Sequence, residues 1–216
     1  MDEHVSGGEL HLKLEFLQRT GSFKARGAVN NILTRDDVER EKGVTAVSAG
    51  NHAIAVAYAA NVLGVSAKVV MHRDANPARV AKCHAFGAEV VLVDDMTQAF
   101  PAMEEIAATE DRSVIHPFDG QATMQGTGTV GLEIAESIAD LDAVVVAVGG
   151  GGLIAGVGSA LKALQPSLTL YGVEPDGASG MSQSLSLGRP LDKVEVNTIA
   201  DSMGAPLHCA ESFAIC

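Results

Sequence analysis

The sequence predicts an α/β fold with two lobes, each an open, mostly parallel sheet with helices on both faces. Short runs rich in β-branched residues alternate with longer Ala-rich segments of helical period, which is the pattern of repeated βαβ units. An apolar fraction of 47% with 19% charged residues is typical of a chain that buries a core. The length of 216 residues suits one large or two small domains.

Strands are expected where short apolar runs are bounded by turn residues and followed by helical stretches. In chain order they are Leu10–Glu15, Val44–Ser48, Ala67–Met71, Ala88–Val93, Ser113–His116, Ala143–Val148 and Thr169–Glu174. We expect residues 44–118 to form a small lobe, and residues 1–43 with 119–216 to form a large lobe. Right-handed crossovers place the carboxyl ends of parallel strands at one edge, so the turns after Ser48 and Val148 should face one crevice.

The charge and cysteine content exclude several classes of partner. Fifteen basic against twenty-seven acidic residues give a net charge of −12, which opposes binding to nucleic acid. No run reaches about 18 apolar residues, so no membrane partner is expected. The three cysteines form no C-x-x-C pair, and the acidic start, MDEHVSGGEL, does not resemble a signal peptide; both favour a cytoplasmic protein.

The first candidate site is the turn T-G-S-F-K-A-R-G, residues 20–27, which places Lys24 between glycines at the start of an amphipathic stretch. Partial desolvation there lowers a lysine pKa toward the neutral amine that attacks carbonyl groups. Phe23 beside it would help to exclude water. A solvated surface lysine without a role is the alternative for this segment alone.

The second candidate site is S-A-G-N-H, which comprises Ser48, Ala49, Gly50, Asn51 and His52 and lies between a strand and a helix. The glycine permits close backbone approach, and the free N–H groups at a helix start suit an anionic oxygen. Asn51 offers an amide that donates and accepts, and it is also a good N-cap. The helix is expected to run from near Asn51 to a stop at Gly64, buried on most faces.

The third candidate site is the tetraglycine loop, Gly149-Gly150-Gly151-Gly152, followed by Leu153 at the start of a helical stretch. Four glycines lose much backbone entropy on folding, which is reasonable if their N–H groups wrap a phosphate at a helix N-terminus. A loose glycine turn is the alternative.

A rival pattern, G-x-G-x-x-G, occurs at residues 126–131 and is the fingerprint of dinucleotide binding. Its context is wrong, because nine residues separate it from the nearest expected strand and no acidic residue follows at the expected distance. We interpret it as a glycine-rich helix start packed closely on its neighbours, and keep a nucleotide-dependent oxidoreductase as a minor hypothesis.

In this order, the lysine turn, S-A-G-N-H and G-G-G-G-L resemble the fold-type II pyridoxal-phosphate enzymes. K-L-E-F-L-Q-R-T-G-S-F-K-A-R-G-A and the later T-I-A-D-S-M-G-A-P look like the threonine/serine dehydratase and serine racemase group. The resemblance implies the fold of that family, with pyridoxal 5'-phosphate as the cofactor and a hydroxy-amino-acid substrate. It also implies a homo-oligomer, since the group is commonly dimeric or tetrameric.

The resemblance also implies roles for individual residues. Lys24 would hold the cofactor as a Schiff base and, once freed by substrate, move the α-proton. Phe23 would line the ring and Asn51 would bond its hydroxyl oxygen. The glycines 149–152, with Leu153, would bind the cofactor phosphate. The substrate carboxylate would lie within the Ser48–His52 turn.

Two positions refine this reading. Racemases of the group look to have a second serine where this chain has Ala49, and a methyl group cannot transfer a proton, so elimination is favoured over racemisation.

Family members often bind Mg²⁺ or Ca²⁺ through a Glu, a carbonyl and an Asp. Glu174 and the Ala178 carbonyl match this set, but Gly180 replaces the Asp. Glu174 could instead cap the turn that follows it.

The family pattern extends beyond both ends of this sequence, so we expect the chain to be truncated relative to the family. The resemblance implies that the large lobe, residues 1–43 with 119–216, binds the cofactor and is incomplete here, because the part that brings a Ser or Cys to the pyridine nitrogen cannot be placed. The leading hypothesis is a dehydratase that converts threonine or serine to a 2-oxo acid and ammonia. A catalytically impaired fragment and a serine or hydroxyaspartate racemase-dehydratase are the alternatives, and the choice of hydroxy amino acid stays open.

Overall fold

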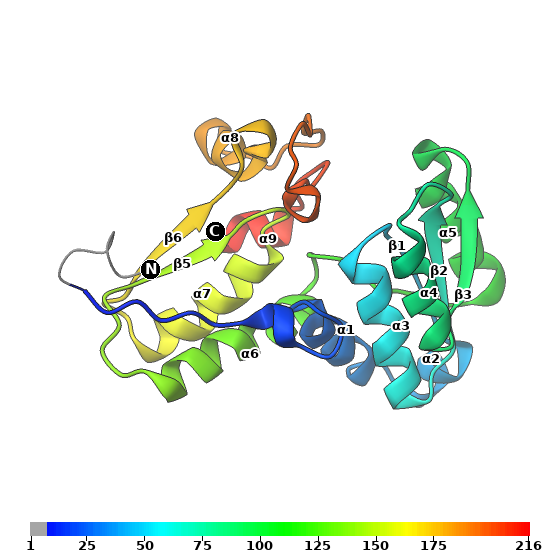
Figure 1. The fold of residues 1–216 in the computed structure, drawn as a ribbon, viewed down its shortest axis with the longest axis horizontal. Helices are drawn as coiled ribbons and strands as arrows, with labels where there is room; N and C mark the ends of the chain where they lie inside the picture. Colours follow the sequence, from blue (N-terminus) through cyan, green and yellow to red (C-terminus); the bar gives the residue numbers. More distant parts are fainter. Residues whose placement is uncertain (1–7) are drawn as a thin grey trace.

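The computed structural model describes residues 8–216 and places them in two parallel sheets at opposite ends of an elongated molecule (Figure 1). The helices are α1 (Lys24–Leu33), α2 (Asp37–Lys42), α3 (Asn51–Leu63), α4 (Pro77–Ala85), α5 (Met96–Glu110), α6 (Gln121–Ser137), α7 (Gly152–Leu164), α8 (Gly180–Leu187) and α9 (Ala210–Ile215). The strands are β1 (Val44–Val47), β2 (Ala67–His72), β3 (Glu89–Val93), β4 (Ser113–Val114), β5 (Ala143–Ala147) and β6 (Thr169–Val173). Short 3-10 turns are η2 (Glu15–Leu17), η3 (Asp176–Ala178) and η4 (Asp201–Met203).

The four-stranded sheet has the order β3-β2-β1-β4, with every pair parallel. Its side chains alternate between two cores, because successive residues of a strand point to opposite faces. On one face, Val69 and Met71 pack with the alanines of α3; on the other, Val70 packs with Met103 of α5. Helices therefore cover both faces of this sheet, and the predicted α/β class is confirmed.

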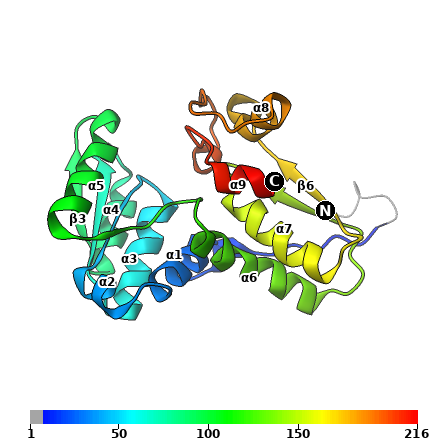
Figure 2. The same cartoon turned by 180° about the vertical axis from the view of Figure 1, so that it is seen from behind.

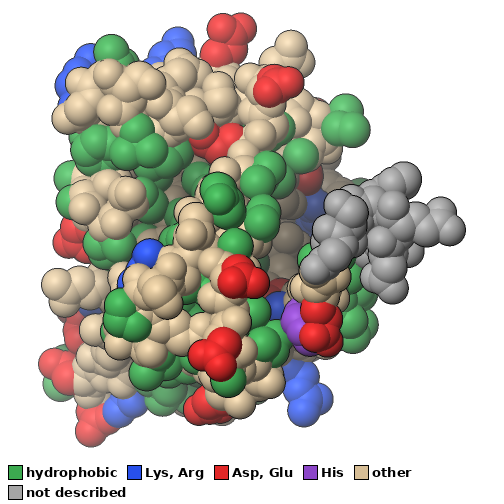
Figure 3. All heavy atoms as spheres, turned by 90° about the vertical axis from the view of Figure 1, so that its left-hand side faces the viewer, with side chains coloured by type: hydrophobic (Ala, Val, Ile, Leu, Met, Phe, Trp, Pro, Cys, Tyr) green, Lys and Arg blue, Asp and Glu red, His purple; other side chains and the backbone are tan. Residues whose placement is uncertain are grey.

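The second sheet consists of β5 and β6, which are parallel and in register from Ala143↔Thr169 to Ala147↔Val173. One face packs on α6 and α7 through Val146, Val157 and Leu161. On the other face Val145, Tyr171 and Val173 are exposed. Figure 3 looks onto this end of the molecule and shows apolar side chains gathered at its surface.

Helix α1 lies between the two sheets, against α3 on one side and α6 on the other (Figures 1 and 2). Gly126 permits the close approach of α6, since a β-carbon there would lie 2.5 Å from the Arg26 carbonyl oxygen. Gly131 likewise permits the close approach of α7, since a β-carbon there would lie 2.8 Å from the Val157 carbonyl oxygen. The close packing expected of residues 126–131 is confirmed, but they lie within α6 rather than at its start. The backbone of neighbouring helices fills the space that a dinucleotide would need.

Three local expectations were wrong. Residues 10–14 form no strand: Leu10, Leu12 and Leu14 are exposed, so their alternation reflects a segment lying on the surface rather than a sheet face. The strand expected at 113–116 ends at Val114. Gly50, not Asn51, is the N-cap of α3, although the helix does stop at Gly64 in the left-handed conformation, as expected. The division into lobes at residues 43/44 and 118/119 stays a prediction.

In the part of the chain that the structure describes, no helix combines the length and apolar character needed to cross a membrane.

Candidate active site

Lys24 is the first residue of α1, so its amine projects from the helix start rather than from a loose turn. The ammonium donates a hydrogen bond to the Pro117 carbonyl and lies 5.2 Å from the Phe23 ring centroid. Burial desolvates the ammonium and lowers the pKa of Lys24 to about 8. The amine is therefore poised to react near neutral pH, which a solvated surface lysine is not.

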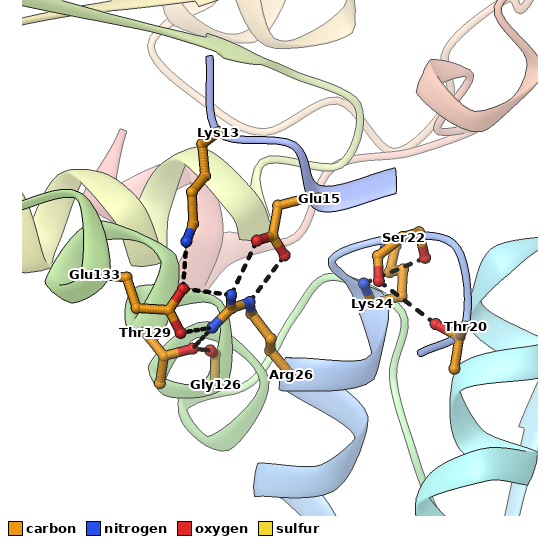
Figure 4. A network of polar contacts seen from close by, with 9 residues as sticks. All are labelled: Lys13, Glu15, Thr20, Ser22, Lys24, Arg26, Gly126, Thr129 and Glu133. Carbon is orange, nitrogen blue, oxygen red and sulfur yellow. Dashed lines mark hydrogen bonds and ion pairs between the residues drawn. The ribbon is translucent and has the colours of Figure 1, made fainter. Parts of the chain in front are cut away.

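A partly buried ion-pair network anchors the start of α1 beside this lysine (Figure 4). The Arg26 guanidinium binds both oxygens of Glu15, at 2.8 and 2.9 Å, and both oxygens of Glu133, at 2.6 and 2.7 Å. It also donates to the Thr129 hydroxyl, and Lys13 bonds Glu133 from the N-terminal segment. Arg26 holds the pKa of Glu133 down at about 2. Bidentate pairs of this kind fix geometry, so α1 is tied to α6 two residues after Lys24.

The Ser48–His52 turn joins the carboxyl end of β1 to α3. The Ser48 hydroxyl accepts from the Gly50 N–H at 3.1 Å, which closes the turn. The His52 Nε2 lies 2.8 Å from the Ile115 carbonyl oxygen, so this nitrogen donates and the ring faces the protein. Burial, and then the Lys24 charge, lower the pKa of His52 to about 3. His52 is neutral, and its backbone N–H remains for an anion at the α3 N-terminus.

The tetraglycine loop follows β5 and opens α7. A β-carbon at Gly150 would lie 2.2 Å from the Phe118 ring, and one at Gly152 would lie 2.2 Å from the Phe118 carbonyl oxygen. Among the described residues, the N–H groups from Gly149 to Leu153 donate to no protein acceptor. A row of free N–H groups at a helix N-terminus is an anion site, since the helix dipole adds to their charge.

The segment after β4 links the three candidate sites, and sequence reasoning missed it. Pro117 accepts the Lys24 hydrogen bond, and Phe118 supports the tetraglycine loop. His116 Nδ1 accepts from the Asp119 N–H at 2.9 Å, while the Asp119 carboxylate accepts from the Ser212 N–H at 3.2 Å. This segment follows a strand end at the same sheet edge as S-A-G-N-H, which was the available signal.

The residues near Glu174 do not favour a divalent cation. Both Glu174 oxygens accept hydrogen bonds at the α8 N-terminus, from the Met181 N–H at 2.7 Å and from the Ser182 N–H and hydroxyl at 2.8 and 2.7 Å. Gly180 supplies no carboxylate, and a β-carbon there would lie 2.4 Å from the His208 Nε2. Residues 8–216 contain no cluster of three His, Cys, Asp or Glu that could hold a metal. A cation at Glu174 and Ala178 stays an untested prediction.

A cavity of about 650 Å³ lies elsewhere, between α7, β6, α8 and the C-terminal residue. Its lining includes neither Lys24 nor the Ser48–His52 turn nor the glycines of the loop. We therefore place the active site by its chemistry rather than by cavity size.

Comparison with known proteins defines the class. The family model described as pyridoxal-phosphate dependent enzyme matches residues 2–216, and the chain belongs to this family. It is 50% identical over 214 residues to a phenylserine dehydratase of Ralstonia pickettii, and this alignment covers 99% of this chain and 66% of that protein. It is 43% identical over 201 residues to an L-threonine ammonia-lyase of Thermotoga maritima, covering 92% of this chain and 50% of that protein.

Solved structures of similar proteins have the same fold as this chain. The processed form of threonine deaminase isoform 2 from Solanum lycopersicum superposes with a TM-score of 0.89 at 38% identity, covering 94% of this chain and 60% of that one. Maize serine racemase superposes with a TM-score of 0.88 at 35% identity, covering 93% of this chain and 61% of that one. The chain thus spans about half to two thirds of the length of these relatives. The predicted family and its fold are confirmed.

The described residues fit pyridoxal phosphate. Lys24 supplies an amine of lowered pKa for the aldehyde, and the loop supplies unpaired N–H donors for the phosphate. The two sites are connected through consecutive residues, Pro117 and Phe118.

Attachment of the cofactor aldehyde to Lys24 should accelerate as the pH rises through about 8. Only the neutral amine attacks, and because the folded-state pKa is lowered, that form predominates above about pH 8 rather than above the ordinary value of about 10.4. The measurement is the rate at which a borohydride-trapped adduct forms on the Lys24 peptide between pH 6.5 and 10.5, with Nα-acetyl-lysine, whose ε-amine is free, as the comparator. If the rate for Lys24 and the rate for the comparator's amine rose over the same pH range, the lowered pKa would be contradicted.

Proposed function

We propose that this chain carries the cofactor- and substrate-binding residues of a pyridoxal-phosphate-dependent dehydratase. Its reaction converts a 3-hydroxy amino acid to a 2-oxo acid and ammonia. The observation that carries the proposal is the Lys24 amine, with a pKa of about 8, bonded to Pro117 beside a tetraglycine loop of unpaired N–H groups. The printed names of the relatives, phenylserine dehydratase and threonine ammonia-lyase, support a hydroxy amino acid as the substrate.

The chain's own residues bind and orient the reactants. The N–H groups from Gly149 to Leu153 would hold the cofactor phosphate, and Phe23 would line the ring. The Asn51 amide would bond the ring hydroxyl oxygen. The Ser48–His52 turn, at the α3 N-terminus, receives the substrate carboxylate through its hydroxyl, amide and backbone N–H groups.

Lys24 moves the proton. When bound, the cofactor supplies an electron sink for the electron pair left at the substrate α-carbon. The Lys24 amine would accept the α-proton, and its lowered pKa raises the fraction of the neutral, basic form available for this step. The protonated Lys24 amine could return its proton to the β-hydroxyl, which would leave as water. Hydrolysis of the enamine product would then consume one water molecule and give the 2-oxo acid and ammonia.

Ala49 supports elimination over racemisation. Inverting the α-carbon needs a second proton donor on the opposite face, and the Ala49 methyl group has no exchangeable proton. The test incubates the chain and pyridoxal phosphate with phenylserine, threonine, serine and 3-hydroxyaspartate, and measures 2-oxo acid and ammonia. We expect equal amounts of both products and no D-amino acid. Accumulation of D-serine without ammonia would favour the racemase alternative.

Removing the cofactor phosphate should weaken binding strongly. Hydrogen bonds to a charged group contribute about 1.5–3 kcal/mol each, so pyridoxal should bind at least about 30-fold more weakly than pyridoxal phosphate. Equilibrium titration followed by fluorescence gives both dissociation constants. Equal constants would show that the tetraglycine loop does not bind phosphate.

A further inference from the structure

One guanidinium joins the Ser48–His52 turn to the opposite half of the molecule. Arg79, on α4, donates from Nη1 to the Asp201 carboxylate at 3.1 Å, and the same nitrogen lies 3.5 Å from the Ala49 carbonyl oxygen. It also lies 3.7 Å from the position of a β-carbon on Gly50. Arg79 therefore contacts the backbone of the turn while its charge is paired elsewhere.

The partner segment touches the tetraglycine loop. Asp201 begins η4, which ends at Met203, and the Met203 carbonyl oxygen lies 3.1 Å from the position of a β-carbon on Gly149. Arg79 holds the pKa of Asp201 below its ordinary value, so this carboxylate is charged at neutral pH. Arg79 and Asp201 thus connect the turn assigned to the substrate with η4, whose Met203 lies against the loop assigned to the phosphate.

This connection has no duplicate in the described part of the chain. Within the described residues, Arg79–Asp201 is the one hydrogen bond or ion pair that joins residues 44–114 to residues 139–216. The other connections between the two sheets run through α1 and α6, which lie between them (Figures 1 and 2), and through the segment after β4, where Phe118 lies against the tetraglycine loop and Asp119 accepts from the Ser212 N–H. Loss of the pair would remove the ion pair that directly joins residues 44–114 to residues 139–216 in the described part of the chain.

We propose that the Arg79–Asp201 ion pair holds the two halves of the molecule together over the active site, with Arg79 as a positioning residue. The importance of this closure for ligand binding rests on the proposed function. An exposed ion pair contributes little to folding stability. A closed and an open arrangement of similar free energy nevertheless change in population when even a small interaction is removed.

The first experiment measures the separation of the halves without any ligand. Spin labels at Glu104→Cys on α5 and Ser186→Cys on α8, with Cys209→Ser and Cys216→Ser in the background, report the distance distribution by pulsed electron paramagnetic resonance. Both labelled positions are exposed. We expect Arg79→Glu and Asp201→Arg each to shift the distribution to longer distances. The double variant, with the charges exchanged, should restore the original distribution.

Two controls separate this effect from a general change of charge. Arg73→Glu removes an exposed pair with Asp94 that lies within one half, and it should leave the distances unchanged. Salt at about 1 M, where the screening length is about 3 Å, should widen the distribution of the unaltered chain. Unchanged distances in both single variants, or failure of the double variant to restore them, would overturn the proposal.

The second readout is the dissociation constant for pyridoxal phosphate. Each single reversal should raise it about two- to fivefold, the range set by exposed ion pairs, and the double variant should restore it. If the unaltered chain binds no pyridoxal phosphate, the proposed function fails for this chain, while the distance measurement still decides the role of Arg79.

Discussion

Replacement of Lys24 by alanine is expected to lower kcat for 2-oxo acid release by at least about 10⁴-fold. The substitution removes both the amine that attaches the cofactor and the base that accepts the α-proton, and proton transfer by a positioned side chain alone contributes about 10²–10⁴-fold. The expectation rests on the position of Lys24 at the start of α1 and on its lowered pKa of about 8. The measurement is continuous detection of the 2-oxo acid from phenylserine or threonine.

Lys82→Ala is the matched control, because Lys82 is an exposed lysine on α4. Its kcat should equal that of the unaltered chain. The Lys24→Ala variant should also keep the circular dichroism spectrum of the parent, since its side chain lies at a helix start. Retention of more than a tenth of the parent activity by Lys24→Ala would rule out Lys24 as the attachment site and base.

Gly126→Ala is expected to lower the free energy of unfolding by about 2 kcal/mol, whereas Gly128→Ala should change it by less than about 0.5 kcal/mol. Both lie inside α6, where alanine gains up to about 1 kcal/mol of helix propensity over glycine. The new methyl group at Gly126 would lie 2.5 Å from the Arg26 carbonyl oxygen and 2.7 Å from the Gly27 Cα. Overpacking against backbone costs about 1–3 kcal/mol or more.

At Gly128 the nearest atom is the Gly156 carbonyl oxygen, at 3.3 Å, so a small shift accommodates the methyl group. Urea denaturation of the parent chain and of the two variants gives the change in the free energy of unfolding for each substitution. Because Arg26 follows Lys24 by two residues on α1, Gly126→Ala should also slow formation of the Lys24 adduct, and Gly128→Ala should not. Equal stabilities would show that α1 and α6 separate freely, and that their contact does not position the lysine.

Local patterns predicted the parts of the fold that depend on neighbouring residues. The β-branched runs identified β1, β2, β3, β5 and β6, and glycine at residue 64 identified the end of α3. Leu10–Glu15 failed because alternation indicates a strand only where a partner strand exists, and here Glu15 instead pairs with Arg26 on α1.

The candidate site was predicted in its motifs but not in its connections. Lys24, S-A-G-N-H and the tetraglycine loop were visible because each breaks the local pattern at the start of a helix. The side-chain direction of His52, toward Ile115, depends on a residue 63 positions away. Pro117, Phe118 and the pair Arg79–Asp201 act through tertiary contacts, which no periodicity encodes.

The most direct test of the central claim is the visible spectrum of the purified chain with pyridoxal phosphate, before and after borohydride, followed by peptide mass spectrometry. We predict an absorbance band that borohydride removes, leaving a stable adduct on the peptide that contains Lys24 and none when the residue is alanine. No band, or an adduct on another lysine, would contradict the assignment of Lys24 and the tetraglycine loop as the cofactor site of this chain.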